Sequence, residues 1–142
     1  MQNKGFTLIE LIIVISILLI IIVFAVPGIT GYQERQNEEQ FVNQLINKLR
    51  EYQLLSITKD LSTKIQVNSS SVLLCENTDC ETLDYKKDIF QNLSPSPTLF
   101  YFNQFGDTAN SNNIIITNDI VLNTNNFLIK VNSYGGIIKE SK

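Results

Sequence analysis

The sequence predicts an α+β protein: a long N-terminal helix, with an apolar membrane half and an amphipathic half, packs on a small antiparallel β-sheet head. Two observations predict this class. Residues 6–58 follow helical patterns, first apolar on every side and then apolar on one side. After residue 59 the apolar period falls from 3.6 to 2, and Asn, Ser, Thr and Gly punctuate the chain. The chain therefore divides into segments 1–5, 6–27, 28–58 and 59–142.

The apolar segment begins directly after a short leader that carries one lysine. As a helix, residues 6–26 would extend about 31 Å, enough to cross a hydrocarbon core of about 30 Å. Glu10 interrupts this run, and an acidic side chain at such a position is costly and indicates a function. A purely structural anchor has no use for that carboxylate.

The amphipathic segment 28–58 continues the helix with one apolar stripe. Pro27 is expected to kink or loosen the helix where the apolar run ends. Glu34 and Glu38 place like charges four residues apart, so we expect their face to be solvated or to meet a basic partner. The stripe predicted to be buried consists of Phe41, Val42, Leu45, Ile46, Leu49 and Tyr52.

Period-2 patterns in the head predict short strands separated by polar turns. A polar turn with two glycines precedes the last of them. The predicted strands are 63–67, 71–75, 98–102, 113–117, 127–132 and 136–139.

Composition argues against an enzyme. The chain has no histidine, which removes the commonest general base and metal ligand, and no nucleophile–base pair or phosphate-binding loop is present. We expect no cofactor and no metal. The Asn- and Asp-rich segment 107–119 lacks the spacing of an EF-hand, which favours a loop with capped turns over a calcium site. A net charge of −3 disfavours a nucleic-acid partner.

Two cysteines, Cys75 and Cys80, lie five positions apart in the head. If the head faces an oxidising compartment, they are candidates for a disulfide, and two unlinked thiols are the alternative. Two cysteines without histidine provide too few ligands for zinc.

Three interpretations of the N-terminus compete. The first is a secretory signal peptide cleaved after the small-residue site at residues 23–25. The second is a signal anchor, for which Lys4 would keep the N-terminus cytoplasmic and leave the head outside. The third rests on the run Gly5-Phe6-Thr7-Leu8-Ile9-Glu10 with its apolar helix. This run resembles the cleavage and methylation motif of type IV pilins and type II secretion pseudopilins.

The resemblance implies that prepilin peptidase cuts between Gly5 and Phe6 and that Phe6 is then N-methylated. It makes 1–5 the leader peptide and 6–27 a helix that is first transmembrane and then in a filament core. It also explains Glu10, whose carboxylate would pair with the Phe6 amine of a neighbouring subunit and set the axial register. The implied partners are other pilin or pseudopilin subunits, prepilin peptidase, an inner-membrane assembly platform and, before assembly, membrane lipid.

The head resembles the C-terminal half of the H-type minor pseudopilins and related minor pilins. The resemblance rests on the aromatic segment 99–106, the aliphatic segments 114–117 and 127–131, and the glycine-led close at 133–138. Two departures stand out: the helix lacks the usual Ala-Arg pattern, and the closing turn has Gly-Gly-Ile where Gly-Arg is common.

The expected function is therefore that of a structural minor subunit of a type II secretion pseudopilus. Its expected location is the bacterial inner membrane, with the N-terminus cytoplasmic and the head extracytoplasmic, and then a pilus-like filament. One alternative is a minor type IV or competence pilin that serves adhesion, motility or DNA uptake. Another is a signal-anchored periplasmic binding protein that does not polymerise.

Overall fold

The computed structural model describes residues 7–85, 87–91, 93 and 98–142, with side chains described outside 23–30. One helix, α1 (Leu8–Thr58), is followed only by strands and loops within these residues. The chain forms two compact units, residues 1–37 and residues 38–142. The first unit contains the beginning of α1, and the second contains the rest of α1 and all the strands. The α+β class predicted from the sequence is confirmed.

The end of α1 is a left-handed cap at the predicted boundary. Asp60 has a φ of +52°, and the Leu61 N–H donates to the Ser56 carbonyl oxygen at 3.1 Å. This bond, from the second residue past the cap to the third-last helical carbonyl, is the Schellman pattern. It ends the helix without a glycine, and the chain turns directly into the first strand.

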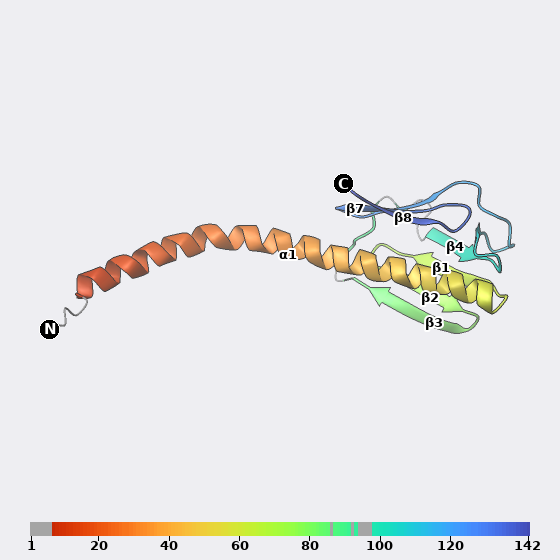
Figure 1. Cartoon of the computed structure of the whole chain (residues 1–142), viewed down its shortest axis with the longest axis horizontal. Coiled ribbons are helices and arrows are strands. Elements are labelled where there is room, and N and C mark those ends of the chain that lie inside the picture. The colour runs from red at the N-terminus through yellow and green to blue at the C-terminus, as the bar shows by residue number, and fades with distance from the viewer. Residues whose placement is uncertain (1–6, 86, 92, 94–97) are drawn as a thin grey trace. The chain divides into compact units, whose positions relative to one another are not determined.

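The first sheet is antiparallel and has five strands in the order β3-β2-β1-β4-β5. Figure 1 shows the last turns of α1, in yellow, lying across β1, β2 and β3. Alternation along β1 and β4 turns every second side chain toward the helix and buries it. The strands are β1 (Thr63–Val67), β2 (Ser71–Glu76), β3 (Asp79–Asp84), β4 (Thr98–Phe102) and β5 (Thr108–Ala109).

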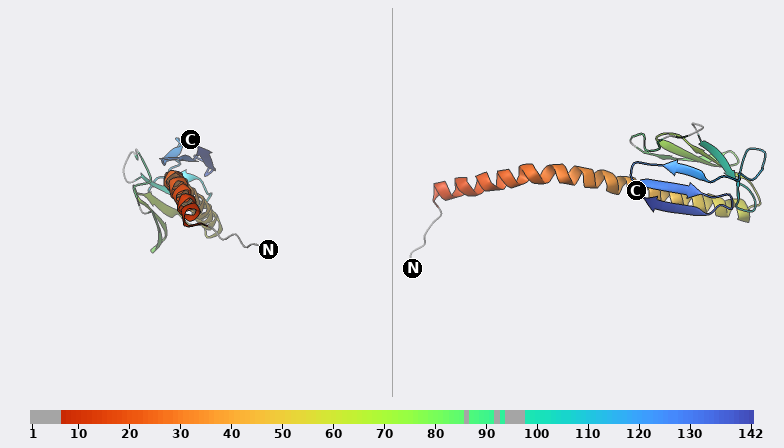
Figure 2. Two further views of the ribbon diagram at one scale, coloured as in Figure 1. Left: turned by 90° about the vertical axis from the view of Figure 1, so that its left-hand side faces the viewer. Right: turned by 90° about the horizontal axis from the view of Figure 1, so that it is seen from above.

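The second sheet is antiparallel with the order β6-β7-β8, formed by β6 (Ile120–Asn123), β7 (Phe127–Val131) and β8 (Ile137–Ser141). Figure 2 shows its strands, in blue, alongside the C-terminal part of α1. Leu122 and Ile129 are completely buried and join the same core as the helix. The sequence predicted a single sheet, whereas the structure has two sheets, and both pack on the same apolar stripe of α1.

The predicted stripe of α1 is buried along its whole length. Val42, Leu45 and Leu49 have no exposed surface, and Phe41, Ile46 and Tyr52 retain at most 7%. Phe41 also packs against Tyr85 and Phe90, with ring centroids 5.1 and 6.2 Å away. The 3.6-residue period was therefore a correct guide to the core.

Three turns of the head share one construction. In each, an Asn side-chain oxygen accepts hydrogen bonds of 2.7–3.1 Å from the backbone N–H groups two and four residues further on. The residue three positions on has a positive φ, as in a type I turn closed by a bulge. The three Asn residues with their left-handed partners are Asn103 with Gly106, Asn110 with Asn113, and Asn132 with Gly135.

Two of these turns pack on each other beside α1. Gln53 Nε2 donates to the Gly106 carbonyl oxygen at 2.8 Å. A Cβ atom on Gly135 would overlap both that oxygen and the Gln53 amide. Glycine is thus required at this position by its positive φ and by the lack of space.

The strand predicted at 113–117 is wrong. The Asn110 side chain captures the N–H groups of Asn112 and Ile114, which turns the backbone, and only an isolated bridge from Ala109 to Ile115 remains. Strands β3, β5 and β6 were missed. β3 was missed because its side chains are mostly polar and exposed, so its alternation is weak.

The expectation that Glu38 is solvated or meets a basic partner is also wrong. Its side chain is 4% exposed and accepts from the Asn126 backbone N–H at 2.9 Å and from the Asn126 side-chain amide. A buried carboxylate is tolerated only when such donors replace water. This contact ties the start of the second unit's helix to the turn between β6 and β7.

Replacing Glu38 by Ala is expected to lower the free energy of unfolding by about 1–3 kcal/mol, because a buried N–H loses its acceptor. Urea unfolding of the full chain in detergent, followed by tyrosine fluorescence, measures the change. Glu39→Ala is the matched control, since its ion pair with Lys139 at 3.0 Å is half exposed and contributes less than about 1 kcal/mol. Equal losses in the two variants would contradict the assigned role of Glu38.

Candidate assembly site on helix α1

The N-terminus of α1 is capped by Thr7. The Glu10 N–H lies 3.4 Å from Thr7 Oγ1 and donates to the Thr7 carbonyl oxygen at 3.1 Å. Thr7 and Glu10 have the spacing of a capping box, which fixes the first turn of a helix. Glu10 therefore lies in that first turn, where the helix dipole favours an anion. The T-x-x-E pattern of Thr7 and Glu10 is the sequence signal for this cap, and it was not among the features predicted from the sequence.

Behind Glu10, α1 presents apolar side chains in every direction. The large apolar residues between 8 and 22 are all 46–77% exposed. The Ser16 hydroxyl donates to the Ile12 carbonyl oxygen at 2.8 Å, so its polar group is satisfied within the helix. An isolated soluble helix gains nothing from such a surface, and apolar patches of this extent indicate an interaction surface.

Glu10 is the single acidic or basic side chain of this surface, among the described residues. It is exposed, and no described residue pairs with its carboxylate. Covering the surrounding apolar residues would desolvate the carboxylate and create a need for a positive partner. The arrangement is suited to packing α1 against another apolar helix whose positive charge lies at the level of Glu10 along the helix axis.

The cleavage residues Gly5 and Phe6 lie outside the described residues, so the Glu10–Phe6 pairing stays a prediction. Helix α1 continues through Pro27, and the predicted kink there also stays a prediction. Within the part of the chain that the structure describes, no helix combines the length and apolar content needed to cross a membrane. The predicted span 6–27 includes Phe6 and side chains after residue 22 that lie outside this description.

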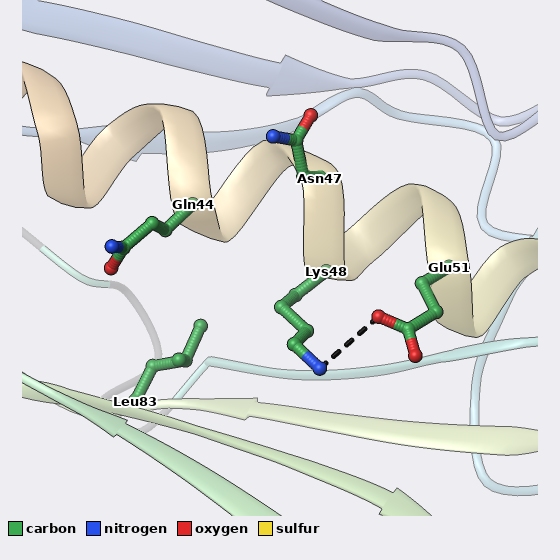
Figure 3. Close-up of a pocket in the computed structure, with 5 residues that line it drawn as sticks. All are labelled: Gln44, Asn47, Lys48, Glu51 and Leu83. Atoms are coloured by element: carbon green, nitrogen blue, oxygen red, sulfur yellow. Dashed lines mark ion pairs between the residues drawn. The ribbon is translucent and has the colours of Figure 1, made fainter.

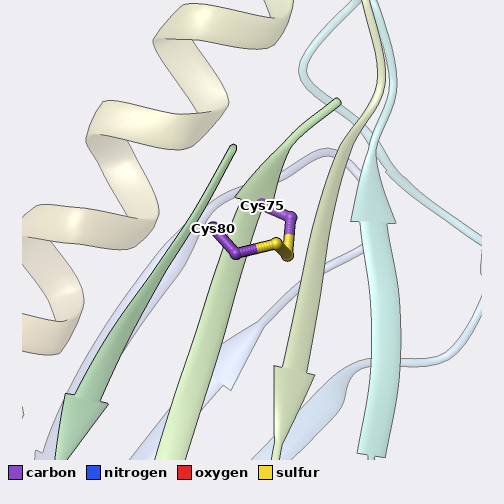
Figure 4. Close-up of a disulfide and its surroundings, with 2 residues drawn as sticks. All are labelled: Cys75 and Cys80. Atoms are coloured by element: carbon purple, nitrogen blue, oxygen red, sulfur yellow. A yellow bond between two sulfur atoms is a disulfide. The ribbon is translucent and has the colours of Figure 1, made fainter. Parts of the chain in front are cut away.

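The two cysteines form a disulfide in the head. Cys75 on β2 and Cys80 on β3 are directly opposite each other, with their Cα atoms 4.1 Å apart (Figure 4). The close approach is typical of a non-hydrogen-bonded antiparallel pair. The turn between the two strands has Asn77 at a φ of +53° in its first central position, as in a type II′ turn. The disulfide candidate from the sequence is confirmed.

A polar groove lies between α1 and β3. Its volume is about 310 Å3, and Figure 3 shows the side chains that line it, with the Lys48–Glu51 ion pair drawn. Lys48 Nζ lies 2.8 Å from Glu81 and 3.1 Å from Glu51. The hydrogen bond to Glu81, followed by that to Glu51, raises the pKa of Lys48 above its usual value. The lining residues are Gln44, Asn47, Lys48, Glu51 and Leu83.

This groove has the chemistry of a contact surface. Its one cation is already shared between two carboxylates, and the remaining polar groups are amides. The described residues contain no group of three or more acidic, Cys or His side chains placed to hold a metal.

Comparison with known families gives one match, at the N-terminus. Residues 1–26 match the prokaryotic N-terminal methylation motif. Neither curated proteins nor solved structures give a match to the chain. The match supports the resemblance of the N-terminal segment to the processed N-terminus of type IV pilins and pseudopilins.

Reducing the disulfide, or replacing both cysteines by Ser, is expected to lower the free energy of unfolding by about 2 kcal/mol, because the short closed loop restricts the unfolded chain. Denaturant unfolding with and without dithiothreitol measures the effect. Dithiothreitol should leave the double Ser variant unchanged. A similar response to reductant in the variant would show that the stabilisation lies elsewhere.

Proposed function

We propose that this chain, with its N-terminal methylation motif, is a structural subunit of a pilus-like filament and has no enzymatic role. The observation that carries the proposal is the all-round apolar exposure of residues 8–22 together with the carboxylate of Glu10, which has no partner among the described residues. Prepilin peptidase would cut between Gly5 and Phe6, and the new N-terminus would be methylated.

Assembly would transfer segment 6–27 from inner-membrane lipid to a core made of the same helices. Lipid tails are as apolar as the side chains, so the gain comes from helix packing and from polar pairs between helices. Methylation leaves the Phe6 amine basic, and that ammonium is the cation that Glu10 of the next subunit would meet. The pair prevents two lone charges in the core and selects one axial offset between subunits.

Among filaments, we favour a type II secretion pseudopilus and a minor, H-type position in it. The aromatic strand β4, which leads to the Gly106 turn, and the glycine-led hairpin of β7 and β8 support this likeness. The segment 114–117, which forms no named strand, departs from it. A minor type IV or competence pilin would be processed and assembled through the same N-terminal segment, and it is the second candidate.

The proposed location is the inner membrane, with the head on the extracytoplasmic side. The disulfide between Cys75 and Cys80 supports this side, because disulfides persist in oxidising compartments. A signal-anchored binding protein of the periplasm would share this location. Such a protein would not need Glu10, so the effect of replacing Glu10 distinguishes the two proposed functions.

Glu10→Ala is expected to reduce incorporation into filaments by about tenfold or more, because an amine left unpaired in an apolar core costs roughly 3–5 kcal/mol. Sheared-filament yield relative to the membrane fraction measures it. Ser16→Ala is the matched control, since the Ser16 hydroxyl bonds only within its own helix. Normal assembly of the Glu10 variant would exclude the register role.

Mass spectrometry of the mature protein tests processing independently. The expected N-terminus is methylated Phe6, and Gly5→Val should leave the leader attached because the peptidase site is lost. A mature chain that begins at Met1 or Val26 would contradict the pilin assignment and favour an anchor or a signal peptide.

A further inference from the structure

Strand β3 ends the five-stranded sheet, and among the described residues nothing pairs with its outer edge. β3 pairs with β2 over six residues, from Asp79 opposite Glu76 to Asp84 opposite Ser71. Within the described residues no other strand pairs with it. An edge strand of this kind carries backbone donors and acceptors that can extend the sheet.

The register identifies which backbone groups face outward. The Tyr85 N–H donates to the Ser70 carbonyl oxygen at 2.8 Å, so the backbone groups of residue 85 point toward the β2 side. Backbone direction alternates along a strand, which turns Leu83, Glu81 and Asp79 the same way. The N–H and carbonyl groups of Cys80, Thr82 and Asp84 therefore point away from β2, and all three residues are exposed.

The edge is held in place before any partner arrives. The Cys75–Cys80 disulfide fastens its first half to β2, and the Tyr85–Ser70 hydrogen bond fastens its end. A preorganised edge loses little conformational freedom on binding, which favours strand addition. β3 buries few of its own side chains, and Leu83 alone among them packs partly against the core, so the disulfide and the Tyr85 hydrogen bond add to a weak core contact.

The groove beside α1 continues this edge. Glu81 reaches Lys48 and Leu83 lines the groove, so these two side chains of β3 face the helix. A strand added next to β3 would turn every second side chain to the same side. Those side chains would enter the space bounded by Gln44, Asn47 and Glu51.

Charge decides what kind of strand fits. On the α1 side, the described carboxylates of β3 and its neighbours are Asp79, Glu81, Glu51 and Glu76. The cations paired with them there are Lys48, shared by Glu51 and Glu81, and Lys59, bound to Glu76. Carboxylates are therefore in excess among these described groups, and Asp84 adds one on the other face. A second copy of β3 would place carboxylates against carboxylates, which is unfavourable in neighbouring strands. Lys or Arg side chains on the α1-facing side of the added strand would be attracted.

We propose that the outer edge of β3 binds, by strand addition, an extended segment of another protein whose alternate residues are Lys or Arg. Backbone hydrogen bonds to Cys80, Thr82 and Asp84 would hold the segment, and the acidic groove would select its basic side chains. This binding site uses other residues than the apolar surface of 8–22, and it does not depend on the filament assignment.

The test uses the full chain in detergent and the capped octapeptide Thr-Lys-Val-Lys-Thr-Lys-Val-Lys, with Glu in place of Lys as the control peptide. Amide NMR should show saturable shifts and slowed exchange at Cys80, Thr82 and Asp84, weakened by salt. The Glu peptide should not bind. Absence of binding, shifts elsewhere, or equal binding of the two peptides would overturn the proposal.

Two pairs of variants locate the site. Thr82→Pro removes one outward N–H and should weaken binding by about tenfold, whereas Thr82→Val keeps it and should bind normally. Asp79→Lys should weaken binding by about fivefold, and more than Asp84→Lys on the opposite face. Unchanged exchange of the Leu83 amide shows that β3 is intact. If Thr82→Pro disturbs β3, the comparison of Asp79→Lys with Asp84→Lys provides the test. Equal losses of peptide affinity in these two variants would show that the groove does not select the basic side chains.

Discussion

The constraint on which the structure depends is that one helix must provide two apolar surfaces of different shape. Its first part is apolar on all sides, whereas residues 41–52 are apolar only on the stripe that the head covers. Each fully buried Leu or Val of that stripe is worth about 1.5–3 kcal/mol. The two sheets cover this stripe, whereas the apolar surface of the first part of α1 stays available to other molecules.

The sequence predicted what depends on short-range periodicity. It predicted the end of α1 at Thr58, the buried stripe, and β1 and β4 with their observed bounds. These features follow from residues a few positions apart. Glu10 was singled out in the same way, because it interrupts an otherwise apolar pattern, and its role in assembly stays a prediction.

What the sequence did not predict depends on partners far along the chain or on single side chains. Glu38 is buried because Asn126, 88 positions away, supplies its donors. Strand β3 exists because β2 offers a ladder, although its own residues are mostly polar. The strand predicted at 113–117 fails because Asn110 competes for its backbone N–H groups.

The three Asn-anchored turns have a consequence for how the head tolerates change. Their hydrogen bonds come from the Asn side chain, the backbone and one left-handed residue, and they do not use the side chain at the tip of the turn. The tips carry Phe105, Asn112 and Tyr134, all exposed. Substitution at these tips changes the chemistry displayed on the surface without altering the backbone that displays it. The head is therefore a fixed frame with three exchangeable positions, where sequence drift or grafted residues would alter surface recognition and leave stability almost unchanged.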